Sequence, residues 1–318
     1  MHSMNGVLLI DKPAGMTSHD VVARVRKIIG ERRVGHTGTL DPFATGLLVL
    51  LIGRATRLAQ FLSGAEKEYE GLIRLGYATD TGDVTGSRIE GEEPHARTRS
   101  AQSLRKDEIQ AAIASLKGEL EQVPPMYSAK KIQGKKLYEF ARAGQEVERP
   151  PVRVTIREFE MLSSADELLR ANDDGSVDLR VRVACSAGTY IRTLAEDLGQ
   201  KLGVGSHVAE LRRTRAGPFQ IDEALTFERL AEVCKLEILD DAIVSPYDAV
   251  SNLPVIELDT DQARRIMHGL DLELAPERPQ SLTDGDAIRL SLNNELIAVG
   301  RFDASQSVIH PGVVLGAE

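Results

Sequence analysis

The residue with the clearest chemical potential in this sequence is Asp41, which lies in the stretch VGHTGTLDPFATGLLVLLI at 34–52. Small and polar residues precede it, and six apolar residues, 47–52, follow it without a break. Such a run is typical of a strand buried on both faces, so Asp41 would be presented by a rigid scaffold. A simpler interpretation is that Asp41 only starts a turn, because Asp-Pro pairs are common in turns. Spacing alone favours the simpler interpretation.

A second candidate, Arg192, stands where an extended segment passes into a helix. Alternation of apolar and polar residues over 177–185 predicts a strand, and SAGTY follows it. Apolar spacing after Tyr190 then predicts a helix that ends at Gly203. Arg192 would lie in the first turn of this helix, where anions are also favoured, so a carboxylate could sit beside it. A purely structural ion pair would give the same pattern.

A third feature is a basic module, 124–151, that is bracketed by the pairs Pro124-Pro125 and Pro150-Pro151. Between 130 and 142 there are five basic residues and only one acidic residue, and aromatic residues are interleaved with them. The basic residues are Lys130, Lys131, Lys135, Lys136 and Arg142. Basic side chains can bind phosphates and aromatic side chains can stack on bases, so this combination favours an RNA-binding insertion. A basic hairpin without a partner is the alternative.

Composition limits the remaining possibilities. The chain has 318 residues and a formal net charge of −9, so any nucleic-acid binding must come from a local basic face. Cys185 and Cys234 are far apart in no CxxC pair, and the histidines are scattered, so we expect a reducing compartment and no metal site. Neither a signal peptide nor an apolar run of membrane-spanning length is present, so we expect a cytoplasmic protein without a membrane partner.

Other patterns predict the elements that would position these residues. A buried strand is expected at 7–10, followed by a helix with a Thr17–Asp20 capping box that ends at Gly30. Three further expectations are a helix at 54–62, an extended segment from Tyr69 and a short helix around 109–116. The segments 78–86 and 88–103 read as a polar loop and a surface connection, and 163–172 shows no distinctive pattern.

The last part of the chain has a different character. The segment 245–253 contains Pro246, is followed directly by Pro254 and shows little periodicity, and we interpret it as a domain boundary. Beyond it we expect one helix near 261–268 and several short strands, two of which meet at an Asn293-Asn294 turn. This pattern indicates a small domain similar to a β-barrel.

Taken together, the motifs resemble those of the bacterial tRNA pseudouridine-55 synthases of the TruB type. They occur in that family's order and cover nearly the whole chain from Met4. The matching stretches are LLIDKPAGMTSHDVV, RRVGHTGTLDPFATGLLVL, EKEYEGLIRLGYATDTGD, VPPMYSAKKIQGKKLYEFAR and CSAGTYIRTLAEDLG with GSHVAELRRT. The tail from about Pro254 resembles the PUA domain that such enzymes carry.

This resemblance implies a role for each matching residue. Asp41 would be the catalytic aspartate, acting on the sugar, on the base or as a proton shuttle, and Arg192 would be its compensating charge. The other implied substrate-binding residues are His36, which would fill the space left by a flipped nucleotide, Tyr69, which would stack on the base, Tyr190 and Leu211. Lys12 and Pro13 would brace the catalytic loop. The RNA-binding residues would be Lys130, Lys131, Lys135, Lys136, Arg212 and Arg213.

The predicted fold is therefore α+β: a central mixed sheet flanked by helices, with a thumb-like basic insertion at about 124–151. We expect a synthase domain at 4–248 and a PUA domain at 253–318. The predicted function is conversion of uridine 55 in the tRNA T-loop to pseudouridine, by a monomer that needs no cofactor, metal or protein partner. Two alternatives remain open. The first is an RNA-binding protein without catalysis, which would have no use for an acid at position 41. The second is a synthase that works in a guide-RNA complex, like dyskerin.

Overall fold

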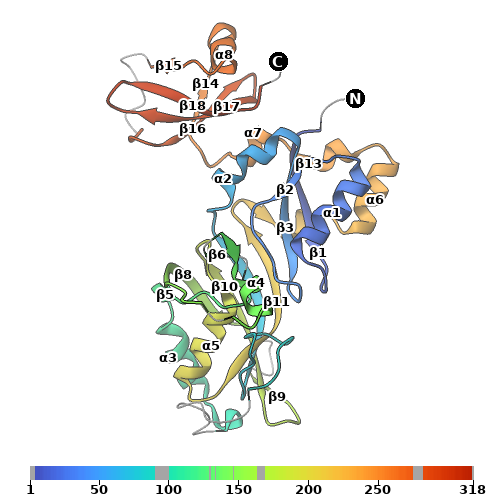
Figure 1. Ribbon diagram of the computed structural model, residues 1–318, viewed down its shortest axis with the longest axis vertical. Coiled ribbons are helices and arrows are strands. Elements are labelled where there is room, and N and C mark those ends of the chain that lie inside the picture. The colour runs from blue at the N-terminus through green and yellow to red at the C-terminus, as the bar shows by residue number, and fades with distance from the viewer. Residues whose placement is uncertain are drawn as a thin grey trace.

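The computed structural model describes residues 4–89, 100–128, 130–132, 134–145, 147–162, 169–274 and 282–316. The molecule is elongated, with a small sheet at one end and a large sheet running through the rest (Figure 1). Helices α1 and α6 lie beside one half of the large sheet, and α3 and α5 lie beside the other half. The predicted α+β class is confirmed. The helices are α1 (Ser18–Ile29), α2 (Ala59–Leu62), α3 (Lys106–Ala114), α4 (Leu137–Arg142), α5 (Ile191–Lys201), α6 (Phe227–Lys235), α7 (Pro246–Ala249) and α8 (Thr260–Met267).

The large sheet has eleven strands among the described residues, in the order β13-β1-β3-β11-β4-β10-β8-β5, with β12, β2 and β9 at the side of β11, β3 and β10. Its pairings are antiparallel except that β3 runs parallel to β11, which makes the sheet mixed as predicted. The strands are β1 (Gly6–Lys12), β2 (Val34–His36), β3 (Thr45–Ile52), β4 (Lys67–Leu75), β5 (Gly118–Gln122), β8 (Val152–Met161), β9 (Leu169–Ala171), β10 (Val177–Cys185), β11 (Ser206–Ala216), β12 (Phe219–Gln220) and β13 (Ile243–Val244).

The parallel pairing depends on Gly46, the second residue of β3. Its backbone has φ +99°, and a Cβ atom there would lie 2.3 Å from the carbonyl oxygen of Arg213 on β11. Only glycine fits this close approach without strain. The contact places the loop before β3 beside β11 and, through β11, near the start of β4.

Several local predictions are confirmed, and one needs correction. Strand β3 is buried along the predicted apolar run, and Gly30 ends α1 in the left-handed conformation after a Thr17–Asp20 capping box. The segment 54–62, predicted as one helix, is instead a 3-10 helix at Gly53–Leu58 followed by the single turn of α2. Ala55 and Leu58 are both fully buried, and a 3-10 helix brings residues three apart onto one side.

The segment 78–86 is a loop, as predicted, but it is not wholly at the surface. Thr79 and Asp83 are buried in it, and the Thr79 hydroxyl donates to the Asp83 carbonyl at 2.7 Å. The loop turns inward because its polar groups have partners inside the molecule. Most of the predicted surface connection, 90–99, lies outside the described residues, as does 163–168.

The C-terminal part forms a five-stranded sheet among the described residues, in the order β14-β16-β17-β18-β15. Asn293 and Asn294 both have positive φ, which confirms the predicted turn between β16 and β17, and α8 confirms the predicted helix. The strands are β14 (Val255–Glu257), β15 (Leu272–Glu273), β16 (Ala287–Leu292), β17 (Glu295–Asp303) and β18 (Val308–Val314).

The two sheets share a hydrophobic cluster, although a boundary was predicted at 245–253. That segment contains α7, and its Ala249 and Val250 are fully buried. They belong to one cluster with residues of β1 and β3 and with Leu296 of β17. Arg54 also donates to the carbonyl oxygens of Leu315 and Gly316 at 3.2 and 2.7 Å. The C-terminal sheet is therefore packed onto the rest of the protein.

This shared cluster leads to a prediction about stability. Leu296→Ala is expected to lower the free energy of unfolding by about 2–5 kcal/mol, the usual cost of truncating a buried leucine. Because the cluster joins the sheets, the parent protein should lose both in one cooperative transition. Differential scanning calorimetry and urea titration measure both quantities. Two separate transitions in the parent, or a cost near zero for the variant, would contradict the shared core.

Candidate active site

The loop that carries Asp41 is held by buried hydrogen bonds to the surrounding elements. The Ser18 hydroxyl, at the start of α1, accepts from the Leu40 amide at 2.9 Å and is 3.2 Å from the Leu40 carbonyl oxygen. From the other side, Nη2 of Arg213 donates to the Gly38 carbonyl at 3.1 Å. These bonds fix the backbone just before Asp41, which positions its carboxylate on a rigid support.

Lys12 contributes a further anchor from the end of β1. It is 0% exposed, and its Nζ donates to the carbonyl oxygens of Pro13, Met16 and Pro42 at 2.9, 2.7 and 3.2 Å. Burial lowers the pKa of Lys12 to about 8, while the nearby Asp41 carboxylate opposes that shift. Lys12 therefore remains charged at neutral pH, and it links β1 to the residue that directly follows Asp41.

Arg192 is enclosed by acceptors in the first turn of α5. Its Nε lies 3.0 Å from Oδ2 of Asp41, and its Nη1 lies 3.4 Å from Oδ2 of Asp83. The same guanidinium donates to the carbonyl oxygens of Thr81 at 2.9 Å and Tyr127 at 2.7 Å. The Arg192 side chain is 5% exposed, whereas that of Asp41 is 32% exposed. Asp41 thus faces the pocket with its counter-charge fixed behind it.

The electrostatic balance at Asp41 is set by opposing effects. Desolvation raises the pKa of Asp41 above its usual range, and the Asp83 carboxylate raises it further. The Arg192 guanidinium and the Lys12 ammonium lower it. Removal of either cation would therefore favour the protonated acid.

A pocket of about 230 Å³ opens at Asp41 and is suited to a small planar group. Tyr69, Tyr190, Arg192 and Leu211 line it together with Asp41, so the structure brings these predicted residues to one place. They come from β4, the N-terminus of α5 and β11, which the sheet topology sets side by side. Burial raises the pKa of the Tyr69 and Tyr190 hydroxyls, so both remain protonated donors at neutral pH.

Other predicted residues occupy different positions. His36, at the end of β2, is not among the residues that line the pocket. Its ring packs edge to face against the ring of His19, with 5.9 Å between the ring centroids. The RNA-binding role of Arg213 stays a prediction, but its side chain does not lie on the outer surface. Arg213 is 2% exposed, lines the pocket and donates to the Leu47 carbonyl at 2.7 Å. The reason is the parallel β3–β11 contact, which turns this arginine inward.

The remaining basic residues lie nearer the surface. Arg212 forms a bidentate pair with Asp11 at 3.0 and 2.7 Å. Lys130 lines the pocket, and Lys131 and Lys135 are exposed on the short hairpin of β6 (Lys131–Ile132) and β7 (Lys135–Lys136). The side chain of Lys136 lies outside the described part of the structure.

Two residues of the site carried no distinct signal in the sequence. Asp83 stands among similar polar residues, and only its place at the end of a family-like motif could have marked it. Lys67, at the start of β4, lines the pocket and donates to the Ser63 carbonyl at 2.6 Å. Burial lowers the pKa of Lys67 to about 8.

No three side chains among the described His, Cys, Asp and Glu residues are grouped in a way that could hold a metal ion. None of the described helices combines the length and hydropathy that a membrane span requires.

Comparison with solved structures identifies the class of protein that has this fold. The structure described as a Cbf5-Nop10-Gar1 complex contains a chain that is 28% identical, with a TM-score of 0.71 over 100% of this chain and 85% of that one. A second, an H/ACA RNP bound to a substrate RNA containing 2'-deoxyuridine, gives a TM-score of 0.69 at 25% identity, over 98% of this chain and 85% of that one. The fold is that of pseudouridine synthases of the TruB and Cbf5 kind.

Sequence comparison is more specific. Residues 26–191 match the model of the TruB family pseudouridylate synthase N-terminal domain, and residues 192–250 match the tRNA pseudouridylate synthase B C-terminal domain. A protein named tRNA pseudouridine synthase B in Bacillus cytotoxicus is 46% identical over 87% of each chain. Its namesake in Geobacillus thermodenitrificans is 44% identical over 93% of this chain and 94% of that one. The chain belongs to the TruB family of pseudouridylate synthases.

Proposed function

We propose that this protein converts uridine 55 in the T-loop of tRNA to pseudouridine, with Asp41 as the catalytic carboxylate. The observation that carries the proposal is the carboxylate of Asp41, which is held 3.0 Å from the buried guanidinium of Arg192 at the edge of a base-sized pocket. Relatives that are 44–46% identical are named for the same modification of tRNA.

The reaction defines what the pocket must do. The bond between N1 of uracil and C1' of ribose breaks, the base turns, and a bond forms between C5 and C1'. The proton on C5 is lost and N1 gains a proton, so the reaction is redox-neutral. Asp41 can attack the sugar, attack the base or carry the proton, and it is needed as an anion for each. Arg192 stabilises this anion in a desolvated pocket.

The target base must first leave the stacked T-loop, which costs a few kcal/mol. Tyr69 offers its ring to the flipped base, and such stacking contributes roughly 1–3 kcal/mol per base. Tyr190 and Leu211 complete the wall, and their position in the pocket supports this assignment. His36 lies outside the wall, at the end of β2 and directly before the loop of Asp41, which suits entry into the gap left by the base.

We further propose that the insertion at 124–151 holds the RNA backbone despite the net charge of −9. Lys131 and Lys135 are exposed on the hairpin, and Lys130 stands at the pocket. Arg212 is available at the surface with its side chain 42% exposed. The C-terminal sheet, interpreted as a PUA domain, would add a second contact, and a monomer would suffice.

Neutralising the four lysines of the insertion tests this assignment. The combined change of Lys130, Lys131, Lys135 and Lys136 to Gln is expected to lower tRNA affinity and to flatten its salt dependence. Each lost phosphate contact should reduce the slope of log K against log [salt] by roughly 0.7–0.9. Filter binding between 50 and 300 mM KCl measures the slope, with Lys106 and Lys117 changed to Gln as the control. An unaltered affinity and slope would show that the lysines are only solvated.

A guide-RNA synthase with protein partners is the rival function. The chain in the Cbf5-Nop10-Gar1 complex is 28% identical to this one, whereas the relatives named tRNA pseudouridine synthase B are 44–46% identical. The higher identity favours a tRNA enzyme over the guide-RNA synthase. Incubation of the isolated protein with a tRNA transcript labelled with tritium at C5 of uridine decides between them. Release of about one tritium per tRNA without any added factor supports the proposal, and no release would refute it.

A further inference from the structure

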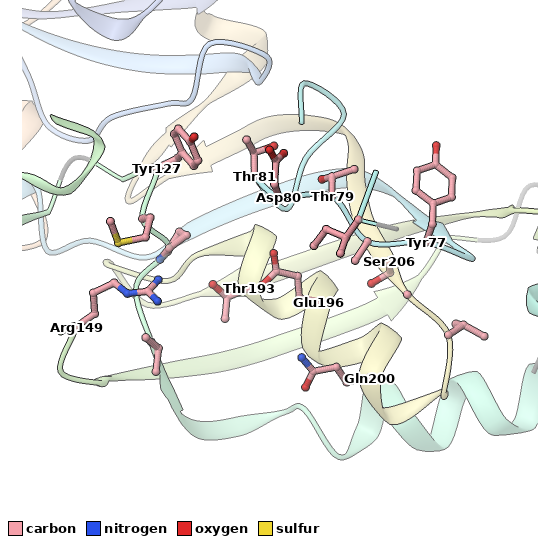
Figure 2. Close-up of a pocket in the computed structure, with 17 residues that line it drawn as sticks. Tyr77, Thr79, Asp80, Thr81, Tyr127, Arg149, Thr193, Glu196, Gln200 and Ser206 are labelled. Atoms are coloured by element: carbon pink, nitrogen blue, oxygen red, sulfur yellow. The ribbon is translucent and has the colours of Figure 1, made fainter. Parts of the chain in front are cut away.

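A second cavity, of about 490 Å³, lies over helix α5 (Figure 2). Its floor is helix α5, which contributes Thr193, Glu196 and Gln200 from one face. The loop 77–81 covers it, and the base of the insertion closes one end with Tyr127 and Arg149. Its volume falls in the range of small-molecule sites, and the proposed reaction makes no use of it.

The cavity and the active site share a wall. Arg192, one helical turn before Glu196, donates to the carbonyl oxygens of Thr81 and Tyr127, and both of these residues line the cavity. Glu196 packs directly under Gly82, where a Cβ atom would lie 2.3 Å from its Oε1. A group bound beside Glu196 would therefore lie next to the residues that enclose Arg192.

Glu196 is the polar group in this cavity that most needs a partner. Within the described part of the chain, no hydrogen bond or ion pair reaches its carboxylate. Burial raises the pKa of Glu196 to about 7, because the charged form is poorly solvated. Arg192 and Asp197 on the same helix, Asp83 on the covering loop and Arg149 on the insertion also face it, and none of them is bonded to it. A half-buried carboxylate without a hydrogen bond or ion pair from the described residues favours a ligand that supplies hydrogen-bond donors and a positive charge.

The other lining residues narrow the class of ligand. Asp80 adds a second carboxylate at the roof of the cavity. Arg149 is its single described cation, and its Nη1 is already bonded to the Pro124 carbonyl at 3.1 Å. Val123 and Pro125 give apolar surface on which methylene groups can pack. Phosphate-bearing ligands are disfavoured by the two carboxylates, whereas an ammonium group on an aliphatic chain matches both the charge and the apolar wall.

We propose that the second cavity binds an aliphatic amine, with the carboxylate of Glu196 receiving an ammonium group. The bound amine would contact the side of Thr81 and Tyr127 that faces away from Arg192, and it would not enter the pocket of Asp41. The inference concerns a different site from the proposed reaction, and binding can be measured on the RNA-free protein, so its outcome is independent of any activity on tRNA.

Isothermal titration of the full-length, RNA-free protein with spermidine at pH 8 tests the site. We expect a dissociation constant below about 1 mM, an affinity typical of a weak small-molecule site. Glu196→Gln keeps the shape and should weaken binding at least about tenfold. Asp240→Asn is the control, because Asp240 is an acid that neither lines the cavity nor acts on the charge of Glu196, and it should leave the affinity within about twofold. Thermal unfolding of both variants checks that each is folded.

The pH dependence gives a second readout. Since the carboxylate must be charged to receive the amine, spermidine should bind several-fold more weakly at pH 6 than at pH 8 in the parent protein, and this difference should vanish in Glu196→Gln. Absence of binding up to about 10 mM spermidine, well above the expected constant, would overturn the proposal. Equal affinity of Glu196→Gln and the parent, or tighter binding of AMP than of spermidine, would overturn it as well.

Discussion

Asp41→Asn is expected to form no detectable pseudouridine, while its affinity for tRNA falls by less than about tenfold, or ~1.4 kcal/mol. Asparagine is nearly isosteric and keeps an oxygen that can accept from Nε of Arg192, now 3.0 Å from the carboxylate. It cannot act as a nucleophile or carry a proton, so chemistry stops while binding persists. Single-turnover tritium release and filter binding measure the two effects separately.

Asp178→Asn is the matched control for this variant. Asp178 is likewise a carboxylate paired with an arginine, since its Oδ1 accepts from Nε of Arg74 at 2.7 Å, but it lies on β10 away from the pocket lining. Its replacement should lower stability and leave turnover near that of the parent. Turnover by Asp41→Asn at a comparable rate would remove Asp41 from the reaction.

Arg192→Met should lose at least about a hundredfold in turnover at neutral pH, or ~2.7 kcal/mol, and regain part of it as the pH rises. Desolvation already raises the pKa of Asp41, and the Arg192 guanidinium is the main effect that lowers it. Without that cation the pKa rises further, so the carboxylate is ionised only at higher pH. The acid limb of the pH–rate profile should therefore move to higher pH.

Arg192→Lys separates charge from positioning. Lysine keeps the positive charge beside Asp41 but cannot reproduce the four contacts of the guanidinium, which include the Thr81 and Tyr127 carbonyls. It should retain the acid limb of the parent while losing turnover at every pH. Equal loss at all pH values in folded Arg192→Met would show that Arg192 acts by positioning and not by charge.

The sequence contained enough to predict the frame of the site. The unbroken apolar run of β3 and the capping box of α1 are local signals, and both elements formed where expected. The loop before β3 and the first turn of α5 were also predicted from a few adjacent residues. The pairing of Asp41 with Arg192 came instead from the resemblance to the TruB family, and the structure brings the two side chains to 3.0 Å.

Features that depend on distant contacts were not predictable in the same way. Arg213 belongs to a basic run that is typical of a surface, and only the parallel contact at Gly46 reveals why it is buried. Asp83 looked like one more polar loop residue, although it lies 3.4 Å from Nη1 of Arg192. The packing of α7 between the two sheets was hidden because Pro246 and the irregular spacing around it resemble a linker.

The most direct measurement of the central claim is position-specific mapping of pseudouridine in an unmodified tRNA transcript. The transcript is incubated with the isolated protein, treated with carbodiimide and read by primer extension. We predict one new stop, at uridine 55 of the T-loop, that is absent with Asp41→Asn and absent when uridine 55 is replaced by cytidine. An unmodified uridine 55, or a stop of equal strength with Asp41→Asn, would contradict the account.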